Sequence, residues 1–223
     1  LASLIAAALA RGATGPNVIF PAALDSAVTR GRIFLFVAPA TSQNEPRLES
    51  GTSLFGVDVA AARPGLRVVV PADTLGYPDA SLAALKPGDY RVQAVFNVYS
   101  EFRRSDGHVI WAHQDQWEGQ HFAKSPGNLV SAVRTLRVAS GQVELDGELT
   151  LERVLPPVEI PADTQWVQRF KFESPRLTKF WGRPMYLGAT VLLPHPEGPT
   201  RASRSPAARV RSSPSRVQVA VSG

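Results

Sequence analysis

The residues that could do chemistry in this chain gather between residues 108 and 122. This segment combines flat aromatic rings, imidazoles, carboxylates and side-chain amides, which suits stacking on a sugar or holding another small ligand through a few polar groups. The candidate binding residues are Trp111, His113, Asp115, Trp117 and His121. The alternative is structural: Trp111 fills the core, while Asp115 or Asn128 bonds the local backbone and braces a long loop. We expect this structural role, in which the polar side chains brace the loop, rather than ligand binding.

The same segment does not have the spacing of a metal site or of a hydrolase active site. The histidines and acids available are His108, His113, His121, Asp106, Asp115 and Glu118. In an extended segment, the four residues between His108 and His113 place the two rings on opposite faces, and there is no helical His-Glu-x-x-His pattern. No Gly-x-Ser-x-Gly turn supplies a serine to His113 and Asp115. We therefore predict no catalytic residue, no metal and no cofactor.

A clear strand pattern leads into this segment. From Tyr90 to Tyr99, apolar side chains alternate with Arg91, Gln93 and Asn97, which is the period of a half-buried strand. Further strands bounded by Gly or Pro are predicted at residues 18–20, 32–37, 53–59, 66–70, 134–138 and 142–152, with at most one helical turn at 81–85. Because a sheet must pack on another layer, the sequence predicts an all-β fold, an antiparallel immunoglobulin-like β-sandwich over residues 16–157.

Tyr90 has a structural role in this prediction. Pro87 and Gly88 make a tight turn just before the strand, and a tyrosine there can fold back so that its hydroxyl bonds the upstream backbone. This arrangement is the tyrosine corner of immunoglobulin-like sandwiches.

The charge and the ends of the chain narrow the function classes. The formal net charge is +5, but residues 195–223 hold five arginines and one acid, so residues 1–194 carry only +1. We predict no nucleic-acid partner, because the basic tail has no interleaved aromatic residues, and no membrane span, because no apolar run is long enough. Residues 1–15 are expected to be a signal-peptide remnant or an N-terminal helix, and a remnant would indicate a secreted or periplasmic protein.

The chain changes character after Pro156-Pro157. Residues 158–164 read as a linker, and residues 165–194 as a β-hairpin whose strands, 166–172 and 183–194, are joined by a turn at 174–182. A hairpin alone is marginal in water, so it would expose an apolar face and open edges. Residues 195–223, rich in Arg, Ser and Pro, are predicted to be disordered.

Several runs together resemble a known family. They are Phe96-Asn-Val-Tyr99, Asp106-Gly-His108, Asp115-Gln-Trp-Glu-Gly119, Ser125-Pro-Gly-Asn-Leu129, Pro156-Pro157 and Phe180-Trp-Gly-Arg-Pro-Met-Tyr-Leu-Gly-Ala-Thr-Val-Leu-Leu-Pro194. This set resembles the N-terminal part of a group of bacterial esterases, in which a β-sandwich domain precedes an α/β-hydrolase domain of the esterase D type.

The resemblance implies that residues 165–194 open the hydrolase sheet and that the catalytic domain would follow Pro194. The tail found there instead does not resemble hydrolase sequence, and we expect a frameshift or a mis-called end. Two functions follow as expectations: a non-catalytic accessory domain of a secreted esterase-like serine hydrolase whose catalytic domain is the missing partner, or a free-standing module that binds a glycan or small molecule.

Overall fold

A computed structural model describes residues 15–42, 45–47, 51–116, 121–193 and 218–222. Strands predominate, with one short α-helix and one 3₁₀ turn among the described residues, which confirms the all-β class. No helix in the described residues is both long and apolar enough to cross a membrane. The N-terminal prediction for residues 1–15 lies almost wholly outside this range.

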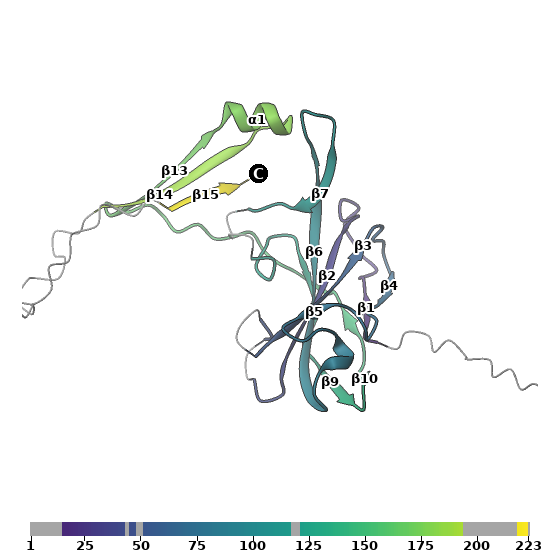
Figure 1. The fold of residues 1–223 in the computed structure, drawn as a ribbon. Coiled ribbons are helices and arrows are strands. Elements are labelled where there is room, and N and C mark those ends of the chain that lie inside the picture. Colours follow the sequence, from purple (N-terminus) through teal and green to yellow (C-terminus); the bar gives the residue numbers. More distant parts are fainter. Residues whose placement is uncertain (1–14, 43–44, 48–50, 117–120, 194–217, 223) are drawn as a thin grey trace, which may run out of the picture.

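Two sheets form the sandwich (Figure 1). The path of the larger sheet is β10 (Gln142–Leu145), β9 (Arg134–Ala139), β6 (Gly88–Arg103), β2 (Gly31–Pro39), β3 (Ser53–Val59) and β5 (Gly76–Tyr77), with β7 (Val109–His113), β8 (Leu129–Val130) and β12 (Arg153–Val154) beside this path. The smaller sheet is β11 (Leu149–Thr150), β1 (Asn17–Ile19) and β4 (Arg67–Val69). The main core lies between the two, where Val18 and Leu149 meet Ile33, Leu35 and Phe96.

One pair of strands departs from the antiparallel arrangement that we predicted. β1 and β11 run parallel, with Val18 opposite Leu149. A parallel pair requires a long connection, and the chain between Ile19 and Leu149, which contains most of the sandwich, supplies it. The helical turn predicted at 81–85 is present as the 3₁₀ turn Leu82–Ala84.

The long strand β6 is buried on both faces in its central part, residues 92–97, where the prediction of a half-buried strand was wrong. Val92, Ala94 and Phe96 face the main core as expected, but Gln93 and Asn97 are also buried, each only 3% exposed. The second face is covered by residues 121–131 and 153–155. Val130 and Leu155 from these segments form a smaller apolar cluster with Phe36 of β2 and Val95 of β6.

Tyr90 makes the backbone contact that its position predicted. Its hydroxyl donates to the carbonyl oxygen of Lys86 at 2.8 Å, across the turn that starts β6. Partial burial raises the pKa of Tyr90, with a smaller contribution from the carboxylate of Asp79. The phenol therefore stays neutral at physiological pH and remains a donor.

The C-terminal part is a third sheet, outside the sandwich. β13 (Val167–Glu173) and β14 (Tyr186–Leu192) pair antiparallel, as the hairpin prediction required. The connection is a helix, α1 (Pro175–Trp181), rather than a turn. Ser174 caps it by accepting from the Leu177 amide, and Gly182 ends it in the left-handed conformation.

A third strand corrects the prediction of a wholly disordered tail. Residues Gln218–Ser222 form β15, which pairs antiparallel with β14. The physical reason is the edge of β14, which offers a row of amide and carbonyl groups to any strand within reach. Residues 194–217 lie outside the described residues.

The other edge of this sheet is also partly covered. The Asp163 carboxylate accepts from the Arg169 amide at 3.2 Å, and Thr164 Oγ1 accepts from the Val167 amide at 3.0 Å. The end of the linker therefore blocks the start of the β13 edge, where we had expected an open one.

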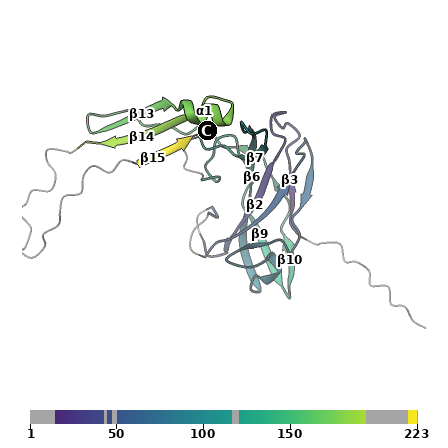
Figure 2. The same ribbon diagram turned by 45° about the horizontal axis from the view of Figure 1, so that its top comes forward.

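The helix α1 joins the two parts of the molecule. Figures 1 and 2 show it beside the tip of the β6–β7 hairpin. The rings of Phe102 and Trp181 meet edge to face with centroids 5.5 Å apart, and the Ser105 amide donates to the Phe180 carbonyl at 2.7 Å. The guanidinium carbon of Arg183 lies 4.1 Å from the Phe102 ring centroid, and burial lowers the pKa of Arg183.

Candidate functional site

A cavity of about 400 Å³ lies where the β6–β7 hairpin leaves the sandwich. Its lining includes Tyr99 and Glu101 from β6, Trp111 and His113 from β7, and Gln114 and Gln116 from the segment that follows. In the β6–β7 ladder, Tyr99 is opposite His113 and Glu101 is opposite Trp111. Residues two apart on a strand share a face, so the ladder itself brings these four side chains together.

Trp111 is only partly available to a ligand. The guanidinium carbon of Arg30 lies 4.8 Å from the centre of the Trp111 ring, and this stacking is a favourable cation–π contact. The Arg30 carbonyl accepts the Tyr99 amide at 2.9 Å, which fixes Arg30 beside β6. One face of the indole is therefore occupied by the protein, and a sugar could stack only on the other.

Tyr99 is another residue in the lining of this cavity. Burial raises its pKa, the Asp58 carboxylate raises it further, and Arg32 opposes the shift. Tyr99 therefore stays neutral at physiological pH and can offer a ligand one donor, but it cannot serve as a base.

His113 is paired with a serine that the sequence did not single out for chemistry. Its Nε2 lies 3.1 Å from Oγ of Ser125, and that Oγ also lies 3.2 Å from the His121 carbonyl. The serine has one proton, and a carbonyl can only accept it, so His113 Nε2 acts as the donor to Oγ. A nucleophilic serine needs the opposite polarity, and Ser125 is fully buried. This pair is structural.

The remaining predicted binding residues do not join Trp111 and His113. Asp115 is buried, at 8% exposure, and is absent from the described lining of the cavity. His121 lines another cavity, of about 380 Å³, with Phe36, Glu45 and Arg153. Trp117 lies outside the described residues. The five residues are therefore one segment of sequence but not one described site.

Asn128 is the centre of the brace that we expected from this loop. Its Oδ1 accepts the Val98 amide at 2.9 Å, and its Nδ2 donates to Asn97 Oδ1 at 3.0 Å and to the Phe122 carbonyl at 2.7 Å. Asn128 is 1% exposed. One side chain thus ties β6 to the covering segment, a role consistent with the local bonding that asparagine provides in turns.

The acids and histidines do not gather into a metal centre in the part of the chain that the structure describes. His108 Nδ1 lies 3.1 Å from Asp106 at the β6–β7 turn, on the far end of the hairpin from His113. Backbone and side-chain hydrogen bonds from His108 lower the pKa of Asp106, and the charge of Arg104 adds to this. These contacts close the turn.

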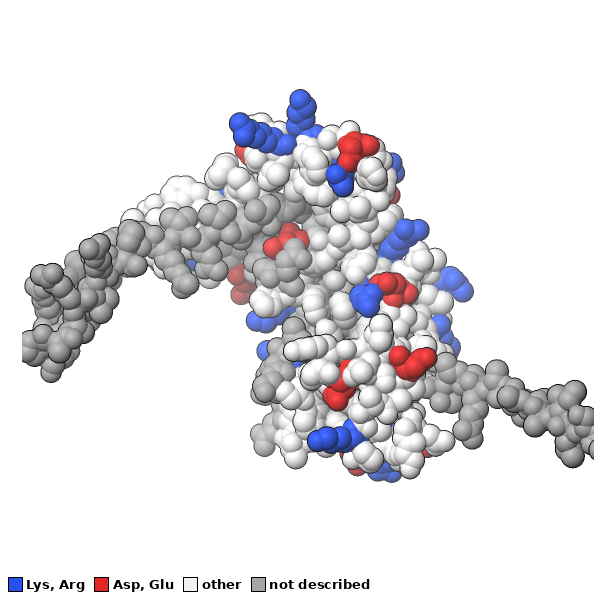
Figure 3. Space-filling view, in the orientation of Figure 1, with Lys and Arg blue, Asp and Glu red and all other residues white. Residues whose placement is uncertain are grey.

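Charged side chains do not form a patch of one sign on the face shown in Figure 3, where basic and acidic groups alternate over the sandwich. Several are paired, including Arg137 with Asp89 at 2.9 Å and Arg32 with Asp58 at 2.8 Å. Comparisons with protein-family models, with curated proteins and with solved structures found no match for this chain.

Proposed function

We propose that this chain is a non-catalytic N-terminal accessory domain of an exported esterase-like serine hydrolase, and that β13 and β14 begin the sheet of the hydrolase domain. The observation that carries the proposal is an apolar sheet face, named here the outer face, formed by Phe170, Phe172, Leu187, Ala189 and Val191. Phe170 and Phe172 are 50% and 55% exposed. A sheet is stable when a second layer covers its apolar face, and the helices of a hydrolase domain would supply that layer.

The resemblance of residues 180–194 to the start of an esterase D type domain supports the same proposal. The contacts between Phe102 and Trp181 and between Ser105 and Phe180 would hold such a domain against the sandwich. The apolar residues 1–10 support export.

We expect the chain by itself to have no esterase activity on p-nitrophenyl acetate. Acyl transfer needs a nucleophile, a base and oxyanion donors assembled together, and the one serine–histidine pair in the described residues has the wrong polarity. Stopped-flow measurement of p-nitrophenol release checks this. A burst equal to the protein concentration would contradict the non-catalytic role.

Complementation tests the proposed partner directly. We expect an esterase D type hydrolase domain that lacks its own opening hairpin to co-purify with this chain and to gain p-nitrophenyl acetate hydrolysis. The double variant Phe170→Ser/Phe172→Ser should abolish both effects, while Leu75→Ser, at a residue 81% exposed on the sandwich, should abolish neither. Failure of the unaltered chain to bind or activate the domain would refute the proposal.

The cavity at Trp111 favours a second function, a free-standing module that binds a neutral sugar. Gln114 and Gln116 line the same cavity as Trp111, although Gln116 Nε2 already donates to the Pro126 carbonyl at 3.1 Å. Calorimetric titration with neutral oligosaccharides separates the two functions. Saturable binding that Trp111→Ala abolishes without a change in melting temperature would favour the module.

A further inference from the structure

The cavity that His121 lines is formed by the second face of β6 and by the segments that cover this face. Its volume is about 380 Å³, within the range of small-molecule sites. Gln93 of β6 and Phe36 of β2, which are opposite each other in the ladder, belong to the lining, and so do the segments 45–47 and 121–124. The cavity therefore lies between the sheet and two covering segments.

The wall that carries Phe122 is held by contacts within the protein. The Lys124 amide donates to the His121 carbonyl at 2.7 Å, and the Phe122 carbonyl accepts from Asn128 Nδ2 at 2.7 Å. The Phe122 ring is stacked on the Phe34 ring, with centroids 4.4 Å apart. The wall is therefore in place before a ligand binds, which lowers the entropic cost of binding.

The lining of this cavity has more cations than anions. Three cations, Arg47, Lys124 and Arg153, stand against one carboxylate among the described lining residues, that of Glu45. The Glu45 carboxylate lies 3.1 Å from Arg153 Nη2 and balances that charge. Within the described residues, Arg47 and Lys124 form no ion pair. Their unbalanced positive charge favours an anion in the cavity.

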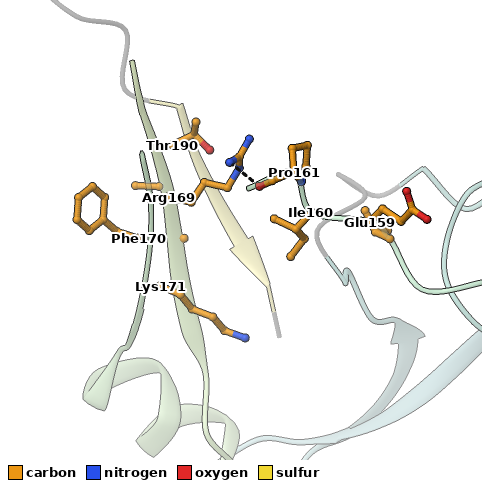
Figure 4. Close-up of a pocket in the computed structure, with 10 residues that line it drawn as sticks. Glu159, Ile160, Pro161, Arg169, Phe170, Lys171 and Thr190 are labelled. Carbon is orange, nitrogen blue, oxygen red and sulfur yellow. Dashed lines mark hydrogen bonds between the residues drawn. The ribbon is translucent and has the colours of Figure 1, made fainter. Parts of the chain in front are cut away.

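The cations of the cavity beside the linker, by contrast, are already engaged (Figure 4). This cavity, of about 360 Å³, lies between the linker and the strands β13 and β14. Arg169 Nη1 donates to the Pro161 carbonyl at 2.8 Å and to Asp163 Oδ1 at 3.0 Å, and Lys171 Nζ lies 4.6 Å from the centre of the Tyr186 ring. An anion there would have to displace these contacts, so the cavity over β6 is the better anion site.

We propose that the cavity over β6 binds a small organic anion with an apolar body, such as an arylacetate. The apolar body would lie against Phe122 and Ala123, which are half-buried in the lining, and would lose apolar surface to water there. The summed positive charge of the lining, rather than one contact, would favour the anionic group. The proposal uses residues of the sandwich and its loops, so it does not depend on the esterase-like assignment.

Titration calorimetry of the full chain with phenylacetate tests the proposal. We expect saturable binding of one phenylacetate per chain, with about tenfold lower affinity for the neutral phenylacetamide, because two exposed cations each contribute a small attraction. The cationic phenethylamine should show no saturable binding, and added salt should weaken the binding of phenylacetate. Absence of saturable phenylacetate binding, or equal affinity for all three compounds, would overturn the proposal.

Single substitutions test the charge of the lining. Arg47→Gln and Lys124→Gln should each weaken phenylacetate binding about threefold, since both residues are exposed and their charges are partly screened. The matched changes Arg63→Gln and Lys86→Gln, at exposed residues outside the described lining, should leave the affinity unchanged. An equal loss in all four variants would show that only the net charge of the protein matters, and it would refute the site.

Two double variants place the ligand in this cavity. Arg47→Glu/Lys124→Glu reverses both unbalanced charges and should abolish phenylacetate binding. Phe170→Ser/Phe172→Ser removes apolar surface from the outer face and should leave the binding unchanged. Circular dichroism checks that each variant is folded. Binding that survives the charge reversal in folded protein, or that is lost with the two phenylalanines, would exclude the cavity over β6.

Discussion

Asn128→Ala is expected to lower the free energy of unfolding by about 3–5 kcal/mol, because it leaves several buried polar groups without their partner at about 1–3 kcal/mol each. The groups that lose a bond are the Val98 amide, Asn97 Oδ1 and the Phe122 carbonyl. Asn97 is 3% exposed and Asn128 is 1% exposed, so water does not readily replace the lost bonds. Urea unfolding followed by tryptophan fluorescence measures the change.

Two further variants make this result specific. Asn128→Asp keeps the oxygen that accepts the Val98 amide, but it sets a second acceptor oxygen against Asn97 Oδ1 and the Phe122 carbonyl in a buried position. We therefore expect a loss at least as large as that of Asn128→Ala. Gln142→Ala removes an amide from an exposed position on β10 and should change stability by no more than about 0.5 kcal/mol. A loss below about 1 kcal/mol for Asn128→Ala would mean that the loop is not braced through this residue.

The strands of the sandwich could be predicted wherever the alternation of apolar and polar residues along the chain matches their burial. β3 spans Ser53–Val59, as its boundary residues predicted, and Val92, Ala94 and Phe96 do face the core. The second face of β6 was not predictable in this way, because Gln93 and Asn97 are polar and read as exposed. Gln93 Nε2 donates to the Ser131 carbonyl at 2.9 Å, and Asn97 is bonded by Asn128. Partners more than thirty residues away decide that these polar groups are buried.

The candidate site could be predicted only in part, because some of its contacts join residues on one strand and others depend on how distant segments fold together. Trp111 and His113 are two apart on one strand, and the structure places both at one cavity. The separation of His121 from them depends on how residues 121–131 fold back over β6. The alternation of apolar and polar residues along the chain does not predict this fold-back. The contact between Ser125 and His113 arises from the same fold-back, and the turn sequence Ser125-Pro-Gly-Asn128 was its one visible signal.

The helix α1 did have a local signal that a strand-based interpretation overlooked. Ser174 followed by Pro175, with Gly182 seven residues later, is the pattern of an N-cap, a first-turn proline and a left-handed C-terminal glycine. The strand β15 overlaps the short apolar run Val217-Gln-Val-Ala-Val221, which is compatible with a strand, but its pairing depends on β14 being within reach.

The purified chain is expected to self-associate through the outer face in the micromolar to millimolar range, and Phe170→Ser/Phe172→Ser should convert it to a monomer. The two phenylalanines are 50% and 55% exposed and lie beside Leu187, Ala189 and Val191, so they form one contiguous apolar patch. Patches of this kind are uncommon on monomeric proteins unless they bind something.

The sheet edges are only partly covered. Asp163 and Thr164 occupy the start of the β13 edge, and β15 pairs with β14 but is itself the edge strand on that side. The double variant therefore separates association through the outer face from association through these edges. Light scattering during size-exclusion chromatography over a concentration series measures the effect, with Leu75→Ser as a control that removes a more exposed apolar residue, 81% exposed, outside the outer face. A monodisperse monomer of the unaltered chain at all concentrations would show that the outer face does not mediate self-association. It would also weaken the proposal that a hydrolase domain covers this face. If the double variant still associates, the contact lies elsewhere on the molecule.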